Sequence, residues 1–112
     1  MAQTDTMTAT AVYKTETPSA FAESIKNPDV FLIDVRTPKE YDEGHISRAK
    51  NIDVQNPDFL ANAKAILPSD KTVAVYCGTG KRSAMASEQL AAAGYKIINL
   101  AGGLAAWNEA GL

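Results

Sequence analysis

The chain has 112 residues, of which 46% are hydrophobic, and a formal net charge of −2 at pH 7. This length fits one domain with one core, and the small net charge gives no electrostatic basis for binding nucleic acid or an anionic membrane. One cysteine and one histidine cannot form an internal disulfide or a structural zinc site, and no apolar run approaches the roughly 20 residues of a membrane span, so we expect a soluble globular domain without a metal.

The first ten residues are polar, rich in threonine and without a hydrophobic period. Such a segment predicts a flexible tail over residues 1–10, followed by a single domain over residues 11–112. The tail lacks the basic start and apolar core of an uncut signal peptide, which favours a cytoplasmic protein. A periplasmic or exported protein, whose signal was removed before residue 1, is the alternative.

Two helix starts are signalled in the first half of the domain. Thr17 and Thr37 each precede a proline, which predicts a helix over residues 18–26 and a second, short helix. Glu40 completes a capping box at the second start, and Gly44 is expected to end that helix. The strands expected in this half are residues 11–13 at an edge, 30–33 in the centre of the sheet, and 50–52.

The second half repeats the alternation of strands and helices. Asn56 and Pro57 predict a helix that ends before Pro68. Two further helices are expected at residues 83–93, stopped by Gly94, and at 104–110, with strands at 72–76 and 96–100. Strands that alternate with helices predict an α/β fold, in which a central parallel sheet of about five strands is flanked by helices.

Cys77 stands where the buried strand 72–76 gives way to a glycine-rich basic segment, the cysteine loop (residues 77–83). Ligands of open parallel sheets bind beyond the carboxyl ends of the strands, where this thiol is expected. The backbone N–H groups of a following helix favour an anion there, which lowers a thiol pKa and produces a nucleophilic thiolate. The alternative is that Cys77 is a small buried hydrophobe.

The rest of the cysteine loop is the candidate substrate or anion site: Gly78, Thr79, Gly80, Lys81, Arg82 and Ser83. The two glycines allow a backbone curl that presents amides inward. Hydrogen bonds to a charged group are worth about 1.5–3 kcal/mol each, whereas a helix dipole contributes about 0.3–1 kcal/mol. We therefore expect the loop amides to dominate activation of the thiol.

The charged and polar side chains of the loop each have two interpretations. Lys81 is either a steering charge or part of a solvated surface. Arg82 either binds an oxyanion or ties the loop to a carboxylate such as Asp34. Ser83 is expected to cap the following helix, with a role in the active site as the alternative.

Three residues outside the loop are expected to have structural roles. Asp34 and Arg36 occupy alternate positions at a strand end and share a face, which predicts an ion pair that supports the site. His45 follows the helix-ending glycine and is expected to satisfy a final helix carbonyl rather than act in catalysis. Trp107 is expected in the core or a pocket wall.

Four stretches, spread from residue 32 to residue 107, resemble the rhodanese family of sulfurtransferases in its small single-domain form. They are Leu32-Ile33-Asp34-Val35-Arg36, Glu43-Gly44-His45-Ile46, Tyr76-Cys77 with the loop through Arg82-Ser83, and Leu100-Ala101-Gly102-Gly103-Leu104 followed by Trp107. The resemblance implies a three-layer domain whose catalytic Cys77 becomes a persulfide. It also implies a sulfur donor such as thiosulfate, an acceptor that is cyanide or a thiol, a sulfur-accepting protein as a further partner, and no cofactor.

Two other functions are open. The first is that of cysteine phosphatases and arsenate reductases, whose cysteine loop also ends with an arginine. The phosphatases have five residues between the cysteine and the arginine, whereas this chain has four between Cys77 and Arg82. A shorter loop makes a smaller anion cradle, which suits a sulfane sulfur better than a phosphoryl group.

The second alternative is a carrier module that accepts persulfide sulfur from a partner protein. Gly78 favours it, because many single-domain members carry a basic residue at this position, and its absence weakens affinity for a free dianion such as thiosulfate.

Overall fold

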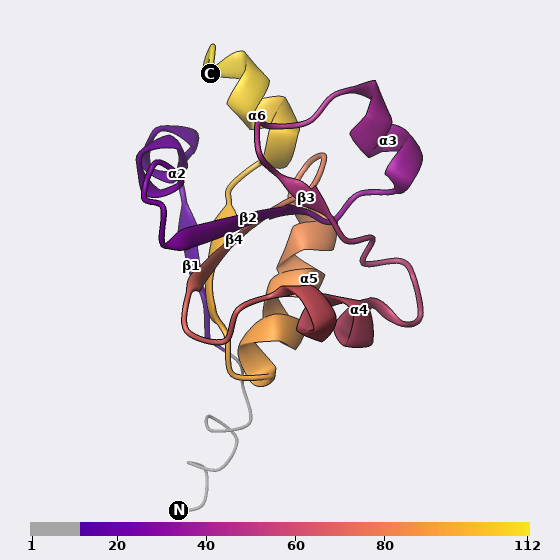
Figure 1. Ribbon diagram of the computed structural model, residues 1–112. Coiled ribbons are helices and arrows are strands. Elements are labelled where there is room, and N and C mark those ends of the chain that lie inside the picture. The colour runs from indigo at the N-terminus through magenta and orange to yellow at the C-terminus, as the bar shows by residue number, and fades with distance from the viewer. Residues whose placement is uncertain (1–11) are drawn as a thin grey trace, which may run out of the picture.

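The computed structural model describes residues 12–112, which form one five-stranded sheet with helices on both faces (Figure 1). All strand pairs are parallel, in the order β1-β5-β4-β2-β3. The strands are β1 (Lys14–Glu16), β2 (Val30–Asp34), β3 (Lys50–Asn51), β4 (Thr72–Tyr76) and β5 (Lys96–Leu100). The helices are α2 (Pro18–Ser24), α3 (Pro38–Glu43), α4 (Phe59–Ile66), α5 (Lys81–Ala92) and α6 (Gly103–Glu109). The α/β fold expected from the sequence is confirmed.

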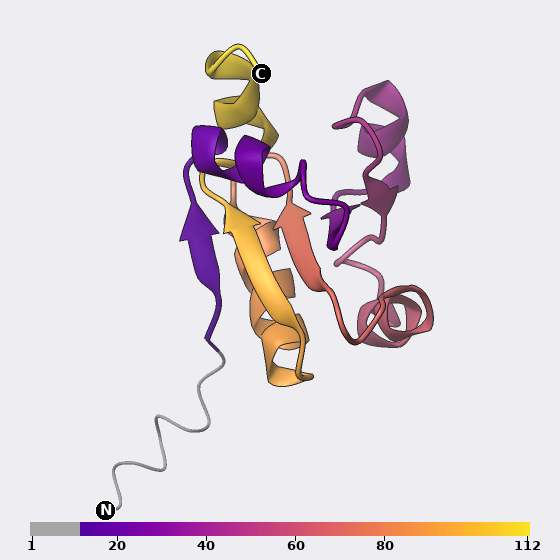
Figure 2. The same ribbon diagram turned by 60° about the vertical axis from the view of Figure 1, so that its left-hand side comes forward.

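The sheet is the middle of three layers because alternate residues of its central strands point to opposite faces. One buried cluster lies between the sheet and the helices α4 and α5, and contains Ile33 and Val75. The other contains Leu32 and Tyr76, and the helices α2 and α6 cover it. Figure 2 shows α2 and α5 on opposite sides of the sheet. Cys77, which follows β4, belongs to the α4–α5 cluster.

Local capping signals set the starts of α2 and α3 as the sequence predicts. The side chain of Thr17 accepts a hydrogen bond from the amide of Ala20. Thr37 and Glu40 form both halves of a capping box, and Gly44 follows α3 as its C-cap. The helix α2 ends at Ser24, slightly before the expected boundary, and the backbone continues as a turn.

The first strand is displaced from its expected position. It covers Lys14–Glu16 rather than residues 11–13, because its register on β5 pairs Lys14 with Ile98 and Glu16 with Leu100. Val12 precedes the strand and is 83% exposed, so its apolar side chain was a misleading signal. Residue 11 and the predicted tail over residues 1–10 lie outside the described residues.

Two further boundaries differ from expectation. The helix α4 begins at Phe59 rather than at Asn56, because Asn56 closes a turn: its side chain accepts from the amide of Asp58 and its carbonyl accepts from the amide of Phe59. The strand β3 ends at Asn51, one residue early, although the amide of Ile52 still donates to the carbonyl of Asp34. None of the helices within residues 12–112 combines the length and apolar character needed to cross a bilayer.

Candidate active site

Cys77 directly follows β4 at the carboxyl edge of the sheet, and it is fully buried. Its Sγ accepts a hydrogen bond from the amide of Gly80 at 3.0 Å. The hydroxyl of Ser83 lies 3.5 Å from the same sulfur and 3.2 Å from the carbonyl of Gly80, so its one proton can be donated to either the carbonyl or a thiolate. The loop therefore curls around the sulfur and brings donors to it.

The electrostatics of this arrangement favour the thiolate. Burial raises the pKa of the Cys77 thiol, but hydrogen bonds from the hydroxyl of Ser83 and from the backbone amides of Ser83, Gly80 and Thr79 lower it by more. The net result is a pKa below that of an ordinary cysteine. Short-range hydrogen bonds with fixed directions thus outweigh the cost of burying a charge.

The structure divides the cysteine loop into residues 77–80 and the first turn of α5. Gly80 adopts φ +109°, a left-handed conformation that favours glycine, and it is the N-cap of α5. The helix therefore starts at Lys81, and the expected capping role of Ser83 is wrong. Ser83 is instead a buried residue within the first turn, and its hydroxyl bonds back to Gly80 and faces the sulfur. Lys81 is exposed.

The start of α6 holds the back of the cysteine loop. The amide of Leu104 donates to the carbonyl of Cys77 at 2.8 Å, and the amide of Ala105 donates to that of Gly78 at 3.0 Å. These carbonyls are thereby bonded to α6 while the amide of Gly80 bonds the sulfur. The sequence did not predict this contact between α6 and the loop.

Arg82 is bound to the carboxylate of Glu40 through both ends of its guanidinium. Its Nη1 lies 2.7 Å from Oε1 and its Nη2 lies 3.0 Å from Oε2. The hydrogen bond with Arg82 holds the pKa of Glu40 at about 2, well below its usual 4.5. Of the two interpretations of Arg82, the structure shows the contact with a carboxylate, but the example given for that carboxylate, Asp34, is wrong. The partner is Glu40 of α3, and Asp34 is paired with Arg36.

Asp34 and Arg36 form the expected ion pair, and both are buried. Nη2 of Arg36 lies 2.7 Å from one carboxylate oxygen, and Nε lies 3.0 and 3.1 Å from the two oxygens. The same Nη2 donates to the carbonyl of Gly44 at 2.6 Å, and the hydrogen bond with Asp34 raises the pKa of Arg36. The pair thus joins the end of β2 to the end of α3. In sequence, these two ends flank Glu40, the residue that binds Arg82.

His45 and Trp107 have the structural positions expected for them. The Nδ1 of His45 lies 2.9 Å from the carbonyl of Tyr41, and the two rings are stacked with centroids 3.7 Å apart. Trp107 packs edge-on against Phe21, with centroids 6.2 Å apart. Among residues 12–112, no three histidine, cysteine, aspartate or glutamate side chains are grouped so as to hold a metal ion.

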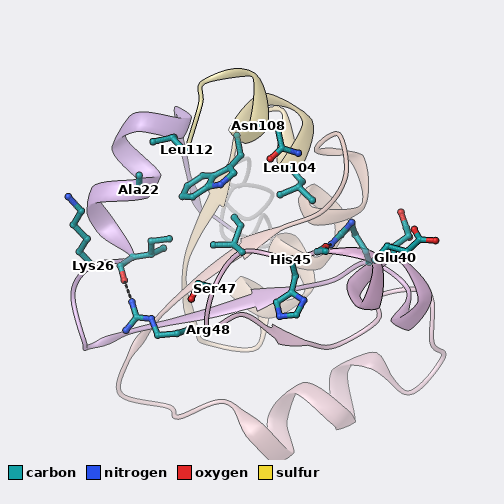
Figure 3. Close-up of a pocket in the computed structure, with 15 residues that line it drawn as sticks. Ala22, Lys26, Glu40, His45, Ser47, Arg48, Leu104, Asn108 and Leu112 are labelled. Carbon is teal, nitrogen blue, oxygen red and sulfur yellow. Dashed lines mark hydrogen bonds between the residues drawn. The ribbon is translucent and has the colours of Figure 1, made fainter.

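A pocket of about 880 Å³ lies beside the cysteine loop, between α2, α6 and the segment after α3 (Figure 3). Trp107 and Leu104 are among its apolar lining residues, and Lys26 and Arg48 are among its charged ones. Cys77 does not line this pocket. The pocket reaches the site only through the residues that support the loop, namely Arg36, Glu40 and Leu104.

Residues 17–110 match the family described as Rhodanese-like domain. The chain belongs to this family. It is 40% identical, over 75% of its length and 77% of the other's, to a protein from Allochromatium vinosum named "Sulfurtransferase". It is also 33% identical to the senescence-associated protein DIN1 of Raphanus sativus, covering 90% of this chain but only 61% of the radish protein.

Solved structures agree with this assignment. The crystal structure of a rhodanese-related protein from Thermoplasma volcanium matches with a TM-score of 0.77 at 35% identity, over 88% of this chain and 94% of that one. The rhodanese-like fold and a relative named as a sulfurtransferase support sulfur transfer as the general function of this chain.

Proposed function

We propose that this chain is a sulfurtransferase that carries a sulfane sulfur as a persulfide on Cys77. The observation that carries the proposal is the hydrogen bond from the amide of Gly80 to the sulfur of a buried cysteine at a strand end. The family membership supports the same reaction class. In this proposal Gly78, Thr79, Gly80 and Ser83 form the anion cradle, Lys81 attracts anionic donors, and Arg82, Asp34 and Arg36 fix the loop and its surroundings.

The proposed cycle has two balanced halves. The Cys77 thiolate attacks the outer sulfur of thiosulfate, a new S–S bond forms, and the old S–S bond breaks with its electron pair leaving on sulfite. The enzyme then holds a persulfide anion. A cyanide ion or a thiolate attacks the terminal sulfur, and the electron pair of the broken S–S bond returns to Cys77 as thiolate. Loop donors stabilise the negative charge in every state, so no separate general base is needed.

A persulfide carrier fed by a partner protein is the second candidate, and one observation favours it. The guanidinium of Arg82 is paired with the carboxylate of Glu40, and Gly78 supplies no positive charge, so the loop offers few unpaired cations to a dianion. A cysteine phosphatase is less favoured, since it also needs its arginine free for a phosphoryl group. A reducing compartment such as the cytoplasm suits either sulfur-transfer function, because the thiol stays available there.

Intact mass spectrometry tests the proposal. Purified protein incubated with thiosulfate should gain one sulfur atom, and cyanide or a reducing thiol should remove it. The Cys77→Ser variant should gain none, since the chain has one cysteine. Turnover of thiosulfate by the serine variant would contradict the assignment. Efficient hydrolysis of an aryl phosphate, lost in Cys77→Ser, would favour the phosphatase instead.

A further inference from the structure

Arg82 turns the Nη1–Nη2 end of its guanidinium toward Glu40, so an oxyanion would have to compete with that carboxylate for this end. Both ends of its guanidinium contact the carboxylate of Glu40, at 2.7 and 3.0 Å. A Cβ built on Gly78 would lie 3.2 Å from Nη2 of Arg82, so the guanidinium lies along the backbone of the cysteine loop. The one arginine that could bind an anionic donor at this loop is thus already neutralised.

From this geometry we propose that Glu40 determines donor specificity: it occupies Arg82 and so disfavours oxyanion donors such as thiosulfate relative to thiol persulfides. The inference rests on the proposed sulfur transfer and narrows its substrate class. Glu40 is a positioning residue, because it acts through Arg82 rather than on the sulfur.

The charges of the two donor classes explain the discrimination. Thiosulfate brings two negative charges, and its sulfonate end can use Arg82 only by displacing Glu40 or lying beside that carboxylate. The reacting group of a thiol persulfide carries one negative charge, located on the sulfur that the loop amides are placed to receive, and it has no sulfonate for Arg82 to bind. Its reaction is balanced in the same way: the Cys77 thiolate takes the outer sulfur, and the S–S electron pair leaves on the thiolate of the donor. No oxyanion forms, so no arginine is needed.

Glu40 is held in place independently of Arg82. Its Oε1 also accepts hydrogen bonds from the amide of Thr37 at 3.2 Å and from its hydroxyl at 3.0 Å. The carboxylate is therefore fixed by the capping box of α3, and Arg82 meets a pre-positioned partner. The capping box tolerates glutamine at this position. Glu40→Gln consequently removes the charge while it retains the helix cap.

Steady-state kinetics with two donors test the inference, using thiosulfate and glutathione persulfide as probes. In Glu40→Gln, we expect the KM for thiosulfate to fall about fivefold with kcat unchanged, because the partly exposed pair is worth about 1 kcal/mol. The KM for glutathione persulfide should stay the same. Adding salt should reduce the gain, since it would come from an exposed guanidinium. Arg82→Gln added to Glu40→Gln should abolish the gain.

Asp42→Asn is the matched control, since it removes one exposed carboxylate from the same helix. It should not change the preference between donors. Arg82→Lys provides a second route if Glu40→Gln does not fold, because lysine lacks the fork and leaves its charge more open to a donor. It should shift the preference in the same direction.

The outcomes separate this inference from the proposed function. If wild-type protein forms a Cys77 persulfide with neither donor, the proposed function fails. If it forms one, but Glu40→Gln leaves the thiosulfate KM unchanged or impairs both donors equally, Glu40 is only a structural anchor and the inference is overturned. A thiosulfate gain equalled by Asp42→Asn would also overturn it, since the effect would then be general charge.

Discussion

Gly103 packs directly against the carbonyl oxygen of Cys77. A Cβ built on Gly103 would lie 2.6 Å from that oxygen and equally close to the carbonyl group of Gly78. The backbone of Gly103 also has φ +63°, in the left-handed region. Only a residue without a side chain allows α6 to approach the cysteine loop this closely.

Replacing this glycine should therefore disturb both stability and the thiol. In Gly103→Ala, the new Cβ would clash with the backbone of Cys77 and Gly78, and the left-handed φ would be strained for alanine. We therefore expect this substitution to lower the free energy of unfolding by about 1–3 kcal/mol. The alkylation rate of Cys77 should change as the loop shifts. Urea unfolding and iodoacetamide kinetics measure the two effects.

Gly111→Ala is the control for this prediction. Gly111 has a similar φ of +78° but nothing within 4 Å of its added Cβ. Its substitution should carry the left-handed penalty alone and leave the Cys77 alkylation rate unchanged. Equal losses of stability in the two variants would show that α6 does not clamp the loop.

The hydroxyl of Ser83 should set the reactivity of the thiol more than Lys81 does. The pKa of Cys77 is lowered because hydrogen bonds to the thiolate outweigh burial, so alkylation rate plotted against pH should show a midpoint below that of an ordinary cysteine. Ser83→Ala should move that midpoint upward. Lys81→Ala should move it much less, because the lysine is exposed and screened. A midpoint restored to its ordinary position by Lys81→Ala alone would contradict this ranking.

Breaking the pair between Asp34 and Arg36 should cost more than any surface ion pair. The two side chains are 0% and 8% exposed, so Asp34→Asn leaves a buried guanidinium without its countercharge. We expect a loss of about 3–5 kcal/mol in the free energy of unfolding, measured by urea titration. Glu23→Gln, which breaks a pair whose side chains are 74% and 69% exposed, should change it by about 0–1 kcal/mol. A similar effect of both variants would argue against the buried pair.

The pair between Glu40 and Arg82 should make stability depend on acid pH. Glu40 has a pKa of about 2 when folded and 4.5 when unpaired. As pH falls from 4.5 to 2, the unfolded chain takes up the proton first, so the free energy of unfolding decreases through this window. The effect should not exceed about 1 kcal/mol, because the Glu40 side chain is 35% exposed. Glu40→Gln should lose this component, as seen in urea titrations across the same pH range. An unchanged pH profile would mean that the pair contributes nothing in solution.

Features set by neighbouring residues were well predicted from the sequence. The strands β4 and β5 have the expected bounds, because short apolar runs end at turn residues on both sides. The capping box at Thr37 is also as expected, since its two members are three residues apart. The Asp34–Arg36 pair follows from the two-residue period of a strand.

The missed features join parts of the chain that are far apart. Glu40 and Arg82 are 42 residues apart in the sequence, so no local pattern indicates their pairing. The capping box of α3 is by itself a sufficient reason for a glutamate at position 40. The contact of Gly103 with Cys77 likewise depends on how α6 packs against the loop. In the sequence, only the pair of adjacent glycines indicates such a close approach. The sequence predicts the start of α5 two residues too late, at Ser83, because serine is a common N-cap. In the structure the N-cap is the left-handed Gly80, which has no side chain to indicate this role.

The full burial of Cys77 has a consequence for which sulfur other molecules can meet. An S–S bond is about 2.05 Å long, so a persulfide at this position extends one atom beyond the enclosed Sγ. Bulky cellular thiols would reach that outer atom before the inner one. Attack on the outer atom passes the sulfur on, whereas attack on the inner one would trap the protein as a mixed disulfide and release the cargo. If the proposed persulfide forms, the depth of Cys77 below the surface would therefore direct attack to the outer sulfur and protect the chain from becoming blocked.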